Sequence, residues 1–224
     1  MADSEVVNID VLDKRLTADG IEWYCEWTKG GDPQRRILVD ENTPLDTFLQ
    51  TVRSRIGDAR IGVLSILAHG WGEYEYRNKE DMKNKKSLKI HGGFGMEFCK
   101  ESIRMDTVER FKELKGLFRG ADIGIKLMGC AAAAEYQFRV CPGVNEFKKG
   151  FGKKLCGKLA EVTGVSVMAS DNLQAVSIDR NERTYRWGSD IRTIKSCVSF
   201  GDWEGSVWIF RPDHSIEKWK PLQR

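Results

Sequence analysis

The sequence predicts an α/β fold with a mostly parallel central sheet, and two observations support that prediction. First, segments of helical periodicity alternate with apolar runs of strand length between residues 43 and 169. Such alternation is typical of parallel sheets with right-handed crossovers. Second, the chain of 224 residues has no internal repeat, no low-complexity tract and only 5 prolines. We therefore expect one domain over 1–224, with a core of about 37–175 and β-rich additions at both ends.

The first helix is expected to begin at Thr43-Pro44, because threonine is a good N-cap, proline suits the first turn and Asp46 completes a capping box. One face of this helix is apolar, with Leu45, Phe48, Leu49, Val52 and Ile56. The run Ile61–Ala68 follows as a strand and leads directly into His69.

Residues 71–105 are polar and turn-rich, and they contain an expected short hairpin broken at Gly92-Gly93. A second helix is predicted from Asp106, capped with Glu109 and ended by Gly120. Its inner stripe consists of Val108, Phe111, Leu114 and Leu117. The next strand, Ile123–Met128, leads into Gly129-Cys130.

A third helix is predicted from an apolar stripe and ends at Thr163-Gly164, before the strand of residues 165–169. The stripe contains Phe147, Phe151, Leu155, Leu159 and Val162. Its lysines lie opposite the stripe, which indicates a solvated helix surface rather than a nucleic-acid face. Two β-like runs come at 6–12 and 21–27, and a hairpin turning at residues 212–214 ends the chain.

Composition excludes several classes of function. Lys+Arg 36 against Asp+Glu 33 gives a net charge of +3, which offers no argument for nucleic-acid binding. No apolar run approaches the roughly 20 residues that span a bilayer, and the start lacks the features of a secretory signal. We expect a cytoplasmic protein, or one delivered to a host or target cell without a recognisable signal peptide.

The cysteines and histidines do not form a metal-binding pattern. The 6 cysteines are scattered without a CxxC, so we expect reduced thiols rather than a disulfide framework. The 3 histidines, His69, His91 and His214, lie at no ligand spacing from a cysteine pair. We expect no metal and no organic cofactor.

His69 and Cys130 occupy the same position on two successive predicted strands, directly after the apolar run. Ligands of open parallel sheets bind outside the carboxyl ends of the strands, and neighbouring strands lie about 5 Å apart. An imidazole and a thiol at these ends could therefore approach each other. A thiol needs a neighbouring base or cation to become the reactive thiolate, so the pair predicts a Cys/His nucleophilic site. Taken singly, each residue reads more readily as structural, and the shared position of the two is what favours a functional site.

The segments ILAHGWG and IKLMGCAAA resemble the caspase-like (clan CD) cysteine peptidases. A third segment, FGKKLCGKLAEVTGVSVMASDN, is similar to the helix and strand that follow the cysteine in a bacterial caspase-like family. The resemblance covers roughly residues 45–175. It implies a caspase-like three-layer sandwich with added β-hairpins.

The resemblance also implies residue roles. Cys130 corresponds to the nucleophile, His69 to the general acid and base, and the backbone N–H groups of Gly70 and Cys130 to the oxyanion donors. Asp171, after the next strand, corresponds to an acidic residue that receives a basic P1 side chain in related members, although Ser170-Asp171-Asn172 also reads as a simple turn. The Q-A-C-x-G context of true caspases is missing around Cys130, which argues against cleavage after aspartate.

The predicted function is that of a cysteine endopeptidase acting on a protein or peptide substrate. Two alternatives stay open at this point: a non-catalytic module that kept the fold, and an acyltransferase or esterase that uses the same dyad. The sequence also leaves open whether self-cleavage or a partner protein activates the chain.

Overall fold

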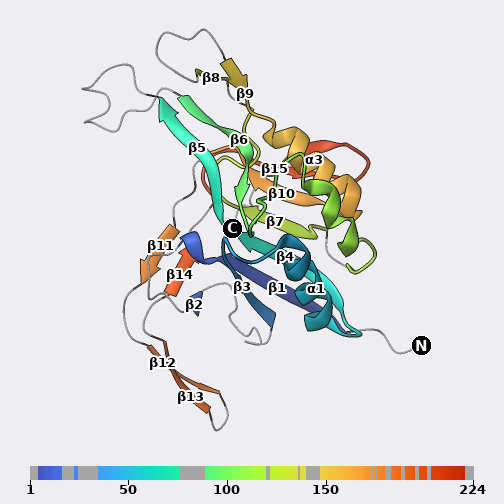
Figure 1. The fold of residues 1–224 in the computed structure, drawn as a ribbon, viewed down its shortest axis with the longest axis vertical. Helices are drawn as coiled ribbons and strands as arrows, with labels where there is room; N and C mark the ends of the chain where they lie inside the picture. The colour runs from blue at the N-terminus through green and yellow to red at the C-terminus, as the bar shows by residue number, and fades with distance from the viewer. Residues whose placement is uncertain are drawn as a thin grey trace.

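The computed structural model describes residues 5–16, 23–24, 35–75, 89–119, 122–135, 137–139, 147–172, 174, 176–179, 183–187, 190–194, 197–200 and 203–219. Its centre is a seven-stranded sheet in the order β16-β15-β10-β7-β4-β1-β3 (Figure 1). Neighbouring strands from β3 to β10 run parallel, whereas β15 and β16 are antiparallel. The bounds are β1 Val6–Asp13, β3 Arg36–Val39, β4 Arg60–Leu67, β7 Ile125–Met128, β10 Val167–Ser170, β15 Val207–Phe210 and β16 Ile216–Lys218. The predicted α/β class with a mostly parallel sheet is confirmed.

Parts of the N- and C-terminal additions expected from the sequence belong to this central sheet. The first β-like run is β1, which lies between β3 and β4. The predicted C-terminal hairpin is the antiparallel pair β15–β16, which extends the other edge. Its turn contains His214 with a φ of 69°, a conformation that few non-glycine residues adopt.

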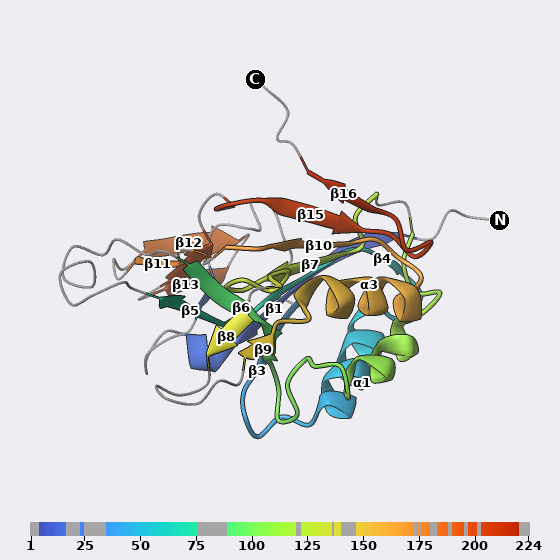
Figure 2. The ribbon, with the colours of Figure 1, turned by 90° about the horizontal axis from the view of Figure 1, so that it is seen from above.

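Three of the described helices lie on one face of the sheet (Figure 2). They are α1 (Leu45–Ile56), the 3-10 helix η3 (Val108–Leu114) and α3 (Gly152–Thr163). Alternate strand residues, such as Ile9, Leu64, Leu127 and Ala169, pack against their apolar faces in a single buried cluster. Each fully buried aliphatic side chain contributes roughly 1.5–3 kcal/mol, so this cluster is the main source of stability.

The helix boundaries differ from the prediction for physical reasons. Thr43 does not cap α1, because its hydroxyl donates to Asp40 and the cap position is Pro44. The Leu45 N–H instead donates to the carboxylate of Glu101, 56 residues away (2.8 Å). The buried stripe of Leu45, Phe48, Leu49, Val52 and Ile56 is confirmed.

The second and third helices are shorter than predicted. η3 is a 3-10 helix that ends before Lys115, not an α-helix from Asp106 to Gly120. α3 begins at Gly152, after the first two residues of the predicted stripe. Phe147 lies in the strand β9 (Phe147–Lys149), and Phe151 is 52% exposed. A side chain at Gly152 would collide with the carbonyl oxygens of Ala132 and Ala134, and this close packing sets where α3 starts.

The segment predicted as a hairpin at Gly92-Gly93 is one continuous strand, β6 (Lys89–Glu97). It pairs antiparallel with β5 (His69–Glu75), which continues from β4 after Ala68. The prediction was wrong because Gly93 permits a close approach between segments rather than a turn. A side chain at Gly93 would meet the carbonyl oxygen of Ala134.

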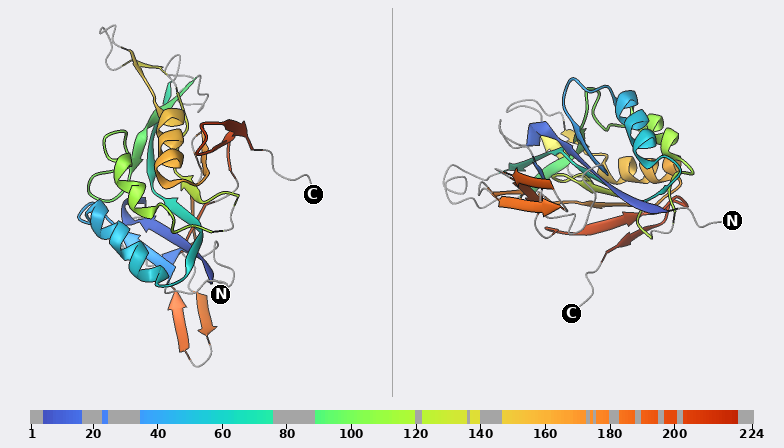
Figure 3. Two further views of the ribbon diagram at one scale, coloured as in Figure 1. Left: turned by 90° about the vertical axis from the view of Figure 1, so that its right-hand side faces the viewer. Right: turned by 90° about the horizontal axis from the view of Figure 1, so that it is seen from below.

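The remaining strands form small sheets away from the main one. Two-stranded hairpins β8–β9 and β12–β13 project from opposite ends of the molecule (Figures 1 and 3). A three-stranded sheet has the order β11-β14-β2. Bounds are η1 Lys14–Leu16, β2 Trp23–Tyr24, β8 Gln137–Arg139, β11 Val176–Asp179, β12 Arg183–Trp187, β13 Asp190–Ile194 and β14 Cys197–Phe200. Within the described ranges, no helix has both the length and the apolar character to cross a membrane.

Candidate active site at four strand ends

Four neighbouring parallel strands, β1, β4, β7 and β10, end at the same edge of the sheet. Leu12 of β1 is in register with Leu67 of β4, and Leu67 with Met128 of β7. His69 and Cys130 each come two residues after that level. The structure therefore brings the two predicted chemical residues to equivalent places at adjacent strand ends.

The glycines of the two motifs allow these strand ends to touch. A side chain at Gly70 would collide with the backbone carbonyl and nitrogen of Cys130. A side chain at Gly129 would come within 2.6 Å of the carbonyl oxygen of Ala68. Each motif thus supplies one chemical residue and one glycine that makes room for the other strand.

His69 is exposed, and its Nε2 lies 3.2 Å from the backbone carbonyl oxygen of Arg15. A carbonyl can only accept, so this contact is a hydrogen bond when Nε2 carries the proton. In a neutral ring, the hydrogen bond at one nitrogen decides the tautomer and leaves the other nitrogen as a base. The contact with Arg15 thus favours Nδ1 as the free base of His69.

Cys130 is half-buried, and its thiol lies against the backbone of Gln174. The Sγ atom is 3.5 Å from the Gln174 nitrogen and 3.7 Å from the Gln174 carbonyl oxygen. That carbonyl can accept from the thiol, and the N–H can donate to a thiolate. In this structure the imidazole and the thiol thus contact different backbone partners.

The turn after Cys130 is tight and conformationally strained. Ala131 has a φ of 49°, an unfavourable region for a residue with a Cβ. Its N–H donates to the Asn172 carbonyl (2.7 Å), and the Ala133 N–H donates to the Ser170 carbonyl (2.9 Å). These bonds fasten the turn to the end of β10, so the strain is held by tertiary contacts.

Asp171 follows β10, as predicted, but its carboxylate is engaged with the neighbouring strand. One oxygen accepts from the Ser206 N–H (3.0 Å) and the other from Trp208 Nε1 (3.0 Å). The Asp171 N–H donates to the Ser206 carbonyl (3.0 Å). The side chain therefore ties the end of β10 to β15, and its interaction with a P1 side chain stays a prediction.

Sequence reasoning missed Gln174, whose buried side chain fixes the loop beside the thiol. Its Nε2 donates to Ser170 Oγ (2.9 Å) and to the Glu204 carbonyl (3.0 Å), and its Oε1 accepts from the Glu204 N–H (3.1 Å). No periodicity or motif marks this residue, because its partners come from other parts of the chain.

Sequence reasoning also missed Asp13 and Arg15, at the end of β1. Here a signal existed: Asp13 follows an apolar strand in the same way as His69 and Cys130 do. Asp13 is fully buried and forms an ion pair with Arg15 at 2.7 Å.

Two of the other described cysteines, Cys99 and Cys156, are poor candidates for the nucleophile, and Cys197 lies in β14. Cys99 and Cys156 are fully buried, and that burial raises the pKa of both thiols. Cys25 and Cys141 lie outside the described residues. Among the described side chains no group of three or more His, Cys, Asp or Glu could hold a metal ion.

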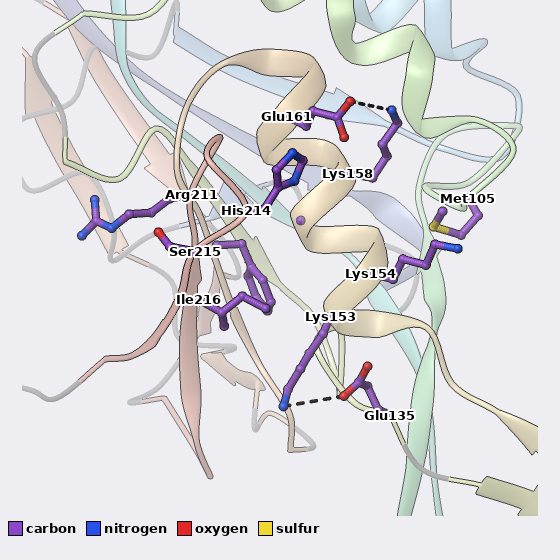
Figure 4. Close-up of a pocket in the computed structure, with 12 residues that line it drawn as sticks. Met105, Glu135, Lys153, Lys154, Lys158, Glu161, Arg211, His214, Ser215 and Ile216 are labelled. Carbon is purple, nitrogen blue, oxygen red and sulfur yellow. Dashed lines mark hydrogen bonds and ion pairs between the residues drawn. The ribbon is translucent and has the colours of Figure 1, made fainter.

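A cavity of about 520 Å³ lies between α3 and the β15–β16 turn, and it contains none of His69, Cys130 and Asp171 (Figure 4). Its basic side chains are largely matched by acids. Lys153 pairs with Glu135 (3.6 Å), and Lys158 with Glu161 (2.9 Å). Paired lysines agree with the expected solvated helix surface and give no excess charge to attract an anion.

Comparisons with known proteins returned no matching family model, no matching curated protein and no matching solved structure.

Proposed function

We propose that the chain is a cysteine endopeptidase in which Cys130 is the nucleophile and His69 the general acid and base. The observation that supports this most directly is the β4–β7 register, which brings the two residues to equivalent positions on touching strand ends. Activated thiols are recognised by a base within reach and by a third group that orients the base. The Arg15 carbonyl is that third group.

The chemistry follows from these positions. His69 takes the proton of the Cys130 thiol at Nδ1, and the thiolate attacks the carbonyl carbon of the scissile peptide. The tetrahedral intermediate collapses as His69 gives its proton to the leaving amine, which leaves an acyl-enzyme on Sγ. A water molecule, deprotonated by His69, then hydrolyses the thioester and restores the thiol.

The oxyanion donors of this proposal are the backbone N–H groups of Gly70 and Cys130, as the resemblance implies. Both belong to the strand ends that pack against each other. N–H groups of tightly packed backbone are already in place before the reaction. Donors that need little reorganisation stabilise an oxyanion most effectively.

A caspase-like three-layer sandwich belongs to the same proposal. Its support is the mostly parallel sheet and the placement of the histidine and the cysteine on successive strand ends. The helices α1, η3 and α3 supply one helical layer, and the second layer stays a prediction. The proposed P1 preference is for arginine or lysine, through Asp171, whose carboxylate would have to accept from the substrate in addition to Ser206 and Trp208.

The test is a P1-diverse peptide library digested with wild type and with Cys130→Ala, combined with iodoacetamide mapping at pH 7. We expect cleavage by wild type only, and faster labelling of Cys130 than of the buried Cys99 and Cys156. Slow labelling without turnover would point to a non-catalytic module. Turnover of esters but not of peptides would point to an esterase or acyltransferase.

A further inference from the structure

The end of β1 carries a buried ion pair beside His69. The side chain of Asp13 is 0% exposed, and that of Arg15 is 25% exposed. Arg15 Nε donates to one carboxylate oxygen of Asp13 (2.8 Å) and Nη2 to the other (2.7 Å). This bidentate geometry holds the guanidinium in one orientation, because each hydrogen bond restricts rotation about the other.

The same carboxylate also binds backbone groups on two elements. It accepts from the N–H of Arg15 (3.1 Å) and from the N–H of Cys99 (3.0 Å), and Arg15 Nη2 donates to the Cys99 carbonyl (2.9 Å). Cys99 has a φ of 54°. The ion pair therefore holds a strained residue two positions after β6, the strand that pairs with β5 at His69.

Arg15 is thus fastened at its amide and at its guanidinium, and its carbonyl is the group that contacts His69 Nε2. The hydrogen bond that Arg15 donates to Asp13 raises the pKa of the Arg15 guanidinium, and the negative charges of Glu97 and Glu41 add to this effect. Glu97 lies directly opposite His69 in the β5–β6 ladder. The backbone partner of His69 in this ladder is thus a residue whose charge also acts on Arg15.

We propose that Asp13 and Arg15 are positioning residues, whose ion pair aims the Arg15 carbonyl at His69 and so keeps Nε2 protonated and Nδ1 free. The effect on Cys130 rests on the proposed peptidase function. The tautomer of His69 does not, and it can be measured by itself.

The experiment compares wild type and Asp13→Asn in the full chain by ¹⁵N NMR of the histidine rings, with His69→Ala used to assign the signal. Asparagine keeps the shape of Asp13, but its NH2 group faces the Cys99 N–H or the Arg15 guanidinium, which are donors. We expect wild type to hold the Nε2–H tautomer and the variant to show a mixture.

The same variant is then followed by the rate at which Cys130 reacts with iodoacetamide from pH 5 to 9. We expect the rate at pH 7 to fall about three- to tenfold, the change expected when one hydrogen bond is lost. The midpoint of the pH–rate profile is expected to rise, because a mixed tautomer is a poorer partner for the thiolate.

Two further variants separate positioning from stability. Arg15→Lys keeps the charge but loses the fork, so we expect it to fold and to give an intermediate tautomer mixture and rate. Glu101→Gln weakens another ion pair, Glu101–Arg110 (2.9 Å), which lies at the start of α1. That variant is expected to lose stability while His69 keeps its tautomer.

The proposal is overturned if wild-type His69 is not the Nε2–H tautomer, or if both Asp13→Asn and Arg15→Lys keep the wild-type tautomer and pH profile. Should Asp13→Asn fail to fold, Arg15→Lys decides. If Cys130 of wild type reacts no faster than a buried thiol, the peptidase proposal fails, and the tautomer comparison still decides the part played by Asp13 and Arg15.

Discussion

The inner and outer strand ends of this edge are built differently. The inner strands, β4 and β7, end in an exposed imidazole and a half-buried thiol, and each contacts backbone groups of a single residue. The outer strands, β1 and β10, end in the carboxylates Asp13 and Asp171, and both oxygens of each accept hydrogen bonds. Asp13 accepts from Arg15 and from the Cys99 N–H, and Asp171 accepts from Ser206 and Trp208. The carboxylates of the outer ends, Asp13 and Asp171, hold segments together, and we call these two residues the frame. The side chains of the inner ends, His69 and Cys130, have fewer bonds and stay available for chemistry.

This difference explains why residue type at a strand end does not by itself define a site. Asp171 and Cys130 both follow an apolar strand, yet the carboxylate of Asp171 is engaged in hydrogen bonds that hold the fold together. A carboxylate that accepts two hydrogen bonds from an adjacent strand stabilises that strand's position. The same position on an inner strand is flanked by other strand ends, which provide backbone groups but few side-chain donors.

The largest expected effect is on the inner ends. Cys130→Ala and His69→Ala should each abolish peptide cleavage, and the double variant should lose little more, because the two act as one unit. Thermal unfolding should stay close to that of wild type, since neither side chain is a buried anchor. Measured kcat/KM and Tm check this, and turnover by Cys130→Ala would remove Cys130 from the mechanism.

A second prediction concerns the outer carboxylate Asp171. Asp171→Asn should lower the free energy of unfolding by about 1–2 kcal/mol, because its amide would face the Trp208 N–H. It should also weaken cleavage after arginine or lysine by roughly one to two decades, the value of a charge-assisted pair of about 1.5–3 kcal/mol. Labelling of Cys130 by a small alkylator should hardly change.

Trp208→Phe is the matched control for this prediction. It removes the donor to Asp171 and leaves the carboxylate in place. We expect it to lower stability without changing the preference among P1 residues. If both variants change the cleavage of all substrates by the same factor, Asp171 has a structural role only and does not contact the P1 side chain.

A third prediction contrasts Cys130 with Cys156. The Cys156 thiol is fully buried in α3 and contacts the Ala132 carbonyl at 3.8 Å. Cys156→Ser should cost about 1–2 kcal/mol of unfolding free energy through burial of a hydroxyl, while kcat is unchanged. Chemical denaturation and peptide assays measure the two effects. Cys25 lies outside the described residues, and its place in a β-like run of the sequence gives the same expectation. Loss of turnover at unchanged Tm would contradict it for either residue.

The smallest effect is expected at Asp10, which is buried on β1 three residues before Asp13. Burial raises its pKa above the ordinary value of 3.8, despite a hydrogen bond to Ser65 and the charges of Arg36 and Lys126. A raised pKa means that the folded state loses stability as the pH rises through that pKa. Asparagine does not titrate, so the variant Asp10→Asn does not lose stability in this way as the pH rises.

We therefore expect the stability of Asp10→Asn relative to wild type to increase as the pH rises from 3 to 7. Urea denaturation at several pH values measures the difference. A constant difference, or one that decreases with pH, would show that Asp10 is as well paired as Asp13.

Local sequence patterns predicted the elements whose formation depends on local chemistry. The buried stripe of α1, the strands that end at His69 and Cys130, and the C-terminal hairpin all follow from periodicity and turn residues. The helix ends did not follow, because Leu45 is capped by Glu101 and α3 is limited by contacts with Ala132 and Ala134. Both contacts join residues far apart in the chain.

By itself, the sequence determined the fold class and the pair of residues, His69 and Cys130, at successive strand ends. Only the tertiary structure decided which strands are neighbours, and so which carboxylates serve the frame and which backbone groups orient the imidazole and the thiol. The physical reason is one of range. Periodicity and turn chemistry act over a few residues, whereas the contact that orients the proposed catalytic side chain joins Arg15 and His69, 54 positions apart.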